Sequence, residues 1–142
     1  MRSEHLSNVH PGWVVGGWLV GVAVTSGAFL ALVGLGLARG TGHGAALAAA
    51  LCMAVGFFAA GLFIGFRWTE APILHGVALA FTSILVWFLA NLLVPDPLGG
   101  EGRGFGSPRV VLGLILLQLV SAVGGGWLGR KTVLGGREGP GS

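Results

Sequence analysis

His75 is the residue of this sequence whose side chain and surroundings best suit chemistry. It is the only histidine, acidic or basic residue within the stretches that we predict to cross a membrane. Ionisable groups are costly there and usually face a partner or a cavity. Imidazole is a good axial ligand for haem or bacteriochlorophyll, and the adjacent Gly76 would leave room for a macrocycle. The alternative is an interfacial histidine that bonds Glu70 or a backbone carbonyl.

A second set of candidate residues is polar but uncharged and lies in the later apolar stretches. Such side chains commonly form hydrogen bonds between helices in a membrane, each worth about 1 kcal/mol or less. The alternative is that they line a pore or a substrate cavity. The set consists of Thr82, Ser83, Asn91, Gln118 and Ser121.

Several kinds of catalytic machinery are missing from the sequence. The apolar stretches hold no acidic residue, which argues against a proton-coupled carrier. There is no embedded Gly-x-Ser-Gly nucleophile, no HExxH motif and only one cysteine, Cys52. We therefore predict a protein that is not an enzyme and that has neither catalytic residues nor a metal site.

The composition indicates which kind of protein must position these residues. Of the 142 residues, 54% are hydrophobic and only 9% are charged, whereas soluble domains average about 25% charged residues. A soluble fold of this size could not cover so much apolar surface. The net charge of +3 comes from cations scattered near the ends of apolar runs. They indicate membrane topology and not a nucleic-acid partner.

Four apolar stretches are long enough to cross the hydrocarbon core, which needs about 20 residues. Short connections between them favour antiparallel neighbours. We therefore predict an all-α fold, a single integral membrane four-helix bundle of antiparallel up-down hairpins over residues 1–142. The helices are expected roughly at 13–38, 45–66, 72–94 and 110–129, with a flexible loop at 95–109 and a polar tail at 130–142.

Cations and tryptophans predict the orientation of the bundle. Four spans put both termini on one side, and that side carries five of the eight Lys and Arg residues. The positive-inside rule then places both termini in the cytoplasm. Amphipathic and cationic side chains at the helix ends are expected to anchor the bundle at the headgroups. These anchors are Trp13, Arg67, Trp68, Trp87, Trp127, Arg130 and Lys131.

Small residues four positions apart recur along the predicted helices. This spacing places them on one helix face, where they let two backbones approach closely. We interpret them as packing seams within the bundle, or alternatively as a face for a neighbouring subunit. The seams are Gly17 with Gly21, Gly36 with Gly40, Gly56 with Ala60, Gly61 with Gly65, and Ser121 with Gly125 and Gly129.

The run from Gly61 to Leu93, GLFIGFRWTEAPILHGVALAFTSILVWFLANLL, carries a family resemblance. It resembles uncharacterised small four-span bacterial membrane proteins, in which a Gly-rich second helix ends in Arg and an "ILHG"-type segment starts the third. The resemblance implies the four-span architecture and a bacterial source, and it implies no activity or site residue.

Three functions remain open at this point. The first is a non-catalytic accessory or scaffold subunit of a larger respiratory or photosynthetic complex in the bacterial cytoplasmic membrane. Its partners would be the lipid bilayer, bound lipids and other integral membrane subunits. The second is a small homo-oligomeric channel or transporter that uses the polar set. The third is a pigment- or haem-binding subunit that uses His75.

Overall fold

Four α-helices and the turns beside them make up the described part of the chain. The computed structural model describes residues 10–38, 43–67, 72–93 and 108–135. The helices are α1 (Pro11–Gly34), α2 (His43–Arg67), α3 (Pro72–Leu93) and α4 (Pro108–Gly135), and the described residues contain no strand. The prediction of an all-α four-helix bundle is confirmed.

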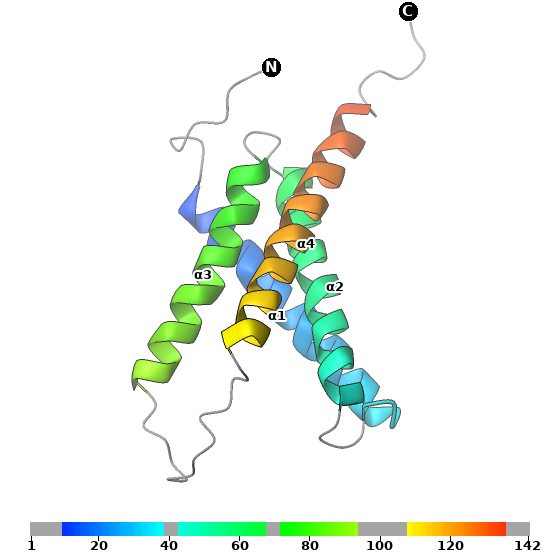
Figure 1. The fold of residues 1–142 in the computed structure, drawn as a ribbon. Coiled ribbons are helices and arrows are strands. Elements are labelled where there is room, and N and C mark those ends of the chain that lie inside the picture. Colours follow the sequence, from blue (N-terminus) through cyan, green and yellow to red (C-terminus); the bar gives the residue numbers. More distant parts are fainter. Residues whose placement is uncertain (1–9, 39–42, 68–71, 94–107, 136–142) are drawn as a thin grey trace, which may run out of the picture.

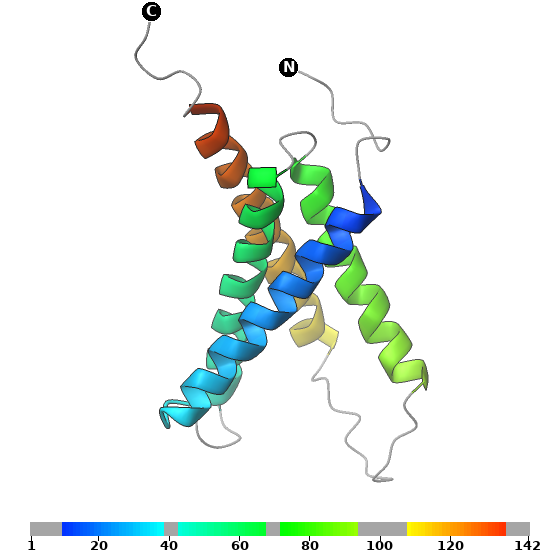
Figure 2. The same cartoon turned by 180° about the vertical axis from the view of Figure 1, so that it is seen from behind.

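The helices alternate in direction (Figures 1 and 2). The start of α1, the end of α2, the start of α3 and the end of α4 lie at one end of the bundle. The helices α2 and α4 form the most extensive contact, α1 packs across α2, and α3 packs mainly on α4. Away from its start, α3 diverges from α2 (Figure 1).

Proline begins three of the four helices. Pro11, Pro72 and Pro108 are the first residues of α1, α3 and α4. The first turn of a helix has no intrahelical partner for its N–H groups, so proline costs no hydrogen bond there. Before Pro11, His10 is extended, with φ −95° and ψ 112°, as steric conflict with the proline ring requires.

The end of α1 differs from the sequence prediction. We predicted helix to Ala38, but α1 ends at Gly34 and the chain turns at Gly36, whose φ is 75°. The Gly36 N–H donates to Val33 O at 3.0 Å and the Leu37 N–H donates to Leu32 O at 2.9 Å. This pair of bonds is a Schellman motif, which stops a helix at a left-handed residue. Hydropathy does not record this stop, because the apolar run continues through it.

The end of α4 also differs from the prediction. We placed it at Gly129 and expected a polar tail from Arg130, whereas the helix continues to Gly135. Arg130 and Lys131 mark the end of the apolar run, but arginine and lysine are good helix formers. The boundary of an apolar run therefore indicates where the hydrocarbon ends and not where the helix ends.

The buried core is small and most large apolar side chains face outward. The core consists of Phe57, Ala60, Ile64, Leu79 and Ala122. In contrast, Leu30, Phe81 and Val120 are each about two-thirds exposed or more, and each helix carries similar residues. Three helices, α1, α2 and α4, are long and apolar enough to cross a membrane. An exterior of this kind suggests a membrane protein that contacts lipid.

Candidate functional site

His75 lies in a buried position where the starts of α1 and α3 meet. Its side chain is only 1% exposed. The backbone N–H of His10 donates to His75 Nε2 over 3.4 Å. The donor is the extended residue just before α1, 65 residues away in sequence. This long-range bond ties the entrance of the first helix to the third helix.

The space beside His75 is filled by protein. A Cβ added at Gly76 would lie 2.7 Å from Val123 Cγ2, so this glycine serves the close approach of α3 and α4 and does not leave room for a macrocycle. Ligation of haem or bacteriochlorophyll through Nε2 would require the His10 bond to break. Glu70, the alternative partner expected from the sequence, lies outside the described residues.

A second long-range hydrogen bond joins α1 to α3 further along both helices. Trp18 Nε1 donates to Ser83 Oγ over 3.1 Å. Ser83 Oγ also lies 3.3 Å from Leu79 O and donates its own proton there. The hydroxyl therefore uses both its donor and an acceptor position. A buried indole N–H normally finds a partner of this kind.

Among the described residues, Gln118 on α4 is the other buried polar residue besides His75. Its side chain is 9% exposed. Gln118 Nε2 lies 3.2 Å from Met53 Sδ on α2 and donates a hydrogen bond to it. A thioether sulfur is a weak acceptor. The amide thus has one weak bond, and within the described part of the chain its oxygen Oε1 accepts none.

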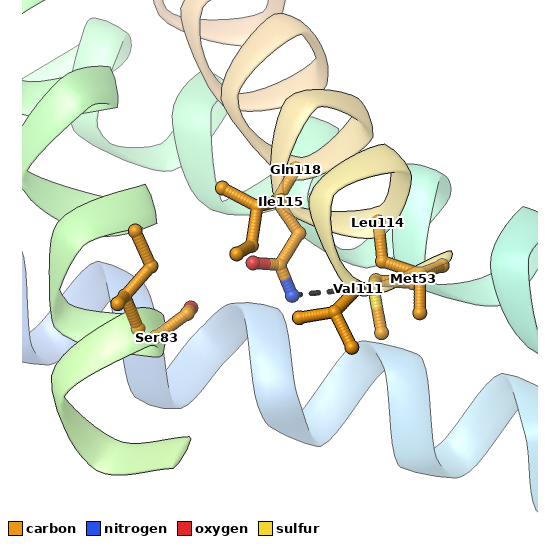
Figure 3. A pocket seen from close by; sticks show the side chains of 7 residues that line it. Met53, Ser83, Val111, Leu114, Ile115 and Gln118 are labelled. Atoms are coloured by element: carbon orange, nitrogen blue, oxygen red, sulfur yellow. Dashed lines mark hydrogen bonds between the residues drawn. The ribbon is translucent and has the colours of Figure 1, made fainter. Parts of the chain in front are cut away.

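Gln118, Met53 and Ser83 line one pocket between α2, α3 and α4 (Figure 3). Its volume is about 160 Å³, and it is partly open. The close-up shows the Gln118 amide between the α3 side of the pocket, where Ser83 lies, and Met53 on the opposite side. The rest of the lining is aliphatic and consists of Ile84, Val111, Leu114 and Ile115.

Of the described members of the predicted polar set, only two therefore lie in the pocket. Ser83 and Gln118 share the pocket, whereas Thr82 donates to Ala78 O of its own helix at 2.8 Å. Ser121 is half-buried on α4 and is not in the pocket lining. The side chain of Asn91 lies outside the described residues.

The glycines of α2 and α4 face each other at the centre of the bundle. A Cβ at Gly61 would collide with Ala122 O, and one at Gly65 with Gly126 O. From the other side, a Cβ at Gly125 would lie 2.9 Å from Leu62 N, and one at Gly129 would lie 2.8 Å from Leu62 O. All these neighbours are backbone atoms. The two helices therefore pack backbone against backbone within one chain.

Gly17, Gly21 and Gly56 form the contact between α1 and α2. A Cβ at Gly17 would lie 2.9 Å from Ile64 Cγ1, and one at Gly21 would lie 3.2 Å from Ala60 Cβ. A Cβ at Gly56 would meet Gly21 O at 2.6 Å and would overlap Thr25 Oγ1. Within the described residues, that buried hydroxyl has no hydrogen-bond partner.

The predicted pair of Gly36 and Gly40 does not form a packing seam within a helix. Gly36 is the left-handed residue just after α1, and Gly40 lies outside the described residues.

The predicted interface anchors lie near the helix ends where the structure describes them. Trp13 is half-buried against Phe63, with ring centroids 6.0 Å apart. Trp127 is exposed, and Lys131 Nζ lies 5.2 Å from its ring centroid. Arg67 is exposed at the last position of α2, and Arg130 is half-buried on α4. Trp68 and the side chain of Trp87 lie outside the described residues.

Two residues of this region were not singled out from the sequence. Trp18 lies inside the first apolar run, where its N–H needs a partner, and this was a usable signal. Met53 resembles any other apolar residue of the second run. Only the tertiary structure places its sulfur against Gln118.

Comparison of the chain with protein-family models, with curated proteins and with solved structures finds no match. The class of protein is therefore described from its fold and its site alone. The chain is a small bundle of apolar helices held together by glycine contacts, with a partly open, largely apolar pocket beside one buried amide.

Proposed function

We propose that this protein is a non-catalytic accessory subunit of a larger assembly in the bacterial cytoplasmic membrane. The proposal is supported by a second face of small residues on α1, which is distinct from the face that packs on α2. Gly17 and Gly21 of α1 are buried against α2. The second face consists of Gly16, Ala23, Gly27 and Gly34, which we call the outer α1 face.

The small residues of the outer α1 face recur along the helix, and the larger Val20 and Leu30 lie between them on the same side. The small residues are spaced by seven, four and seven residues, which keeps them on one side of an α-helix. A Cβ added at Gly16, Gly27 or Gly34 would meet nothing within 4 Å, and Ala23 is exposed. Small residues gain little from lipid, but they let a neighbouring helix come close. This supports a membrane helix of another subunit as the partner.

The localisation and orientation belong to the same proposal. The apolar exterior supports residence in the membrane. The excess of Lys and Arg on the side of the termini supports a cytoplasmic location for both ends. The assembly that we propose is a respiratory or photosynthetic complex, in which this subunit has no catalytic role.

Extraction from the native membrane in mild detergent tests the proposal. The tagged protein should carry a stoichiometric set of larger membrane subunits, identified by mass spectrometry. Gly27→Leu, which places a bulky side chain on the outer α1 face, should remove these subunits without unfolding the bundle. Recovery of the protein alone, or only with copies of itself, would refute the proposal.

Gly113→Leu is the matched control. Gly113 lies on α4 and, like Gly27, would place a Cβ in open space. The same substitution at this site should leave the co-purifying subunits in place. Equal loss of partners from both variants would show that the outer α1 face is not the contact.

A channel or transporter remains the second candidate because Ser83 and Gln118 meet in one pocket. The aliphatic lining favours an apolar molecule over a hydrated ion there. Liposome flux assays on the purified protein test this candidate, and flux above that of empty liposomes would support it.

A further inference from the structure

The Gln118 amide lies in the wall of the pocket with unused bonding capacity, and its oxygen keeps accessible surface. A primary amide offers two N–H donors and a carbonyl acceptor with two lone pairs. Here one N–H donates to Met53 Sδ, and Oε1 accepts nothing from the described residues. Leaving such a group unsatisfied in an apolar environment costs free energy. The site therefore favours any apolar molecule that brings a matching polar group.

The size and lining of the pocket restrict that molecule. A cavity of about 150 Å³ lined by aliphatic residues holds one benzene ring, and this pocket is about 160 Å³. Four of its lining residues are aliphatic, and Met53 adds a thioether. Thioether sulfur makes favourable contacts with aromatic ring edges. One aromatic ring therefore fits both the volume and the chemistry.

The depth of the pocket indicates how the molecule arrives. Met53, Ser83 and Gln118 lie near the middle of their helices. In a membrane this is the level of the acyl chains, and a phospholipid chain has no polar group there. Because the pocket is partly open, we expect a molecule dissolved in the hydrocarbon to enter it from the lipid.

We propose that this pocket binds the ring of a membrane-soluble phenol, with the phenol hydroxyl held by the Gln118 amide. The hydroxyl donates to Gln118 Oε1 and can accept from Nε2, so it satisfies both ends of the amide. Met53 contacts the ring edge, and the aliphatic residues enclose its faces. Hydroquinone headgroups belong to this chemical class, and their tails would leave through the open side. The proposal does not depend on the accessory-subunit function.

Photo-crosslinking tests the binding. The full chain in lipid nanodiscs is irradiated with a 4-alkylphenol that carries a diazirine on its alkyl chain, and the labelled residues are mapped by mass spectrometry. Labelling should concentrate on the pocket segments of α3 and α4. Unlabelled 4-pentylphenol should compete about fivefold better than pentylbenzene, the factor that one ordinary hydrogen bond contributes. Concentrations are corrected for the measured partitioning of each compound into lipid.

Gln118→Leu should abolish the preference for the phenol over pentylbenzene. Thr82→Val is the matched control, because Thr82 bonds its own helix outside the pocket, and it should keep the preference. Ile115→Phe, which fills the pocket, should suppress labelling altogether. Equal competition by the two compounds on the unmodified protein would overturn the proposal without any variant. Labelling spread evenly over the outward faces of all helices, or a preference retained in Gln118→Leu, would also overturn it.

Discussion

Gly125→Ala is the sharpest test of how this bundle is held together. A Cβ at Gly125 would lie 2.9 Å from Leu62 N and 3.0 Å from Phe58 C, and closer still to Phe58 O. Ordinary contacts of a Cβ begin near 3.4 Å. Because every one of these neighbours is backbone, no side chain can rotate away. Because Phe58 O is the nearest of these atoms, the helix α4 must move away from α2 by about 1 Å.

The free-energy cost of that movement follows from the lost dispersion contacts. A gap of about 0.5–1 Å forfeits about a quarter to a half of an atom-pair attraction of about 0.1–0.2 kcal/mol. If the seam holds about as many close pairs as one buried leucine, about 40–60, the loss is about 1–6 kcal/mol. Overpacked interiors lose about 1–3 kcal/mol. We expect Gly125→Ala to lower the free energy of unfolding by about 2 kcal/mol.

Titration of a denaturing detergent into protein held in mild micelles measures this free energy, with far-ultraviolet circular dichroism as the signal. Gly113→Ala is the control, because its Cβ would meet nothing within 4 Å. It should be neutral or stabilising by up to about 1 kcal/mol through helix propensity. If Gly125→Ala lies within about 0.5 kcal/mol of this control, close packing of α2 and α4 does not stabilise the bundle.

Three further predictions use the same unfolding assay. Trp18→Phe removes the donor to Ser83 and should lower the free energy of unfolding by about 1 kcal/mol. When Trp18→Phe is combined with Ser83→Ala, the two losses should be less than additive. Full additivity would show that the hydrogen bond contributes nothing. Gly36→Ala forces a Cβ onto a φ of 75° and should cost about 1–2 kcal/mol; an unchanged free energy of unfolding would contradict the Schellman stop. Lys131→Gln should change stability by less than about 1 kcal/mol, because exposed cation–π contacts are weak; a larger loss would mean that Lys131 has a partner besides Trp127.

The fold class was predictable because its signals are local. Four apolar runs and short connections specify helices of about the observed length without any knowledge of the tertiary structure. Two helix ends were misplaced for a definite reason. Hydropathy measures partition into lipid, whereas Gly36 stops α1 through backbone conformation and the cations after Gly129 leave α4 unbroken.

The glycine spacing in the sequence identified which faces could pack, but not which helices they would meet. A four-residue repeat defines a face, and in a chain with 28 glycines several pairings of such faces are geometrically equivalent. The tertiary structure pairs Gly61 and Gly65 with α4, and Gly17 and Gly21 with α2. It leaves the outer α1 face uncovered within the described chain.

A bundle of four apolar helices, the polar residues in it and most of its glycine faces could be predicted from the sequence, because each of these depends on residues near one another in the chain. The pair of Gly36 and Gly40 was the exception, since Gly36 is a left-handed residue after α1. The tertiary structure alone decided the partners. The bond from His10 to His75, the bond from Trp18 to Ser83 and the bond from Gln118 to Met53 each join residues 65 positions apart. Contacts over such distances depend on how the helices cross, and no local pattern encodes that geometry.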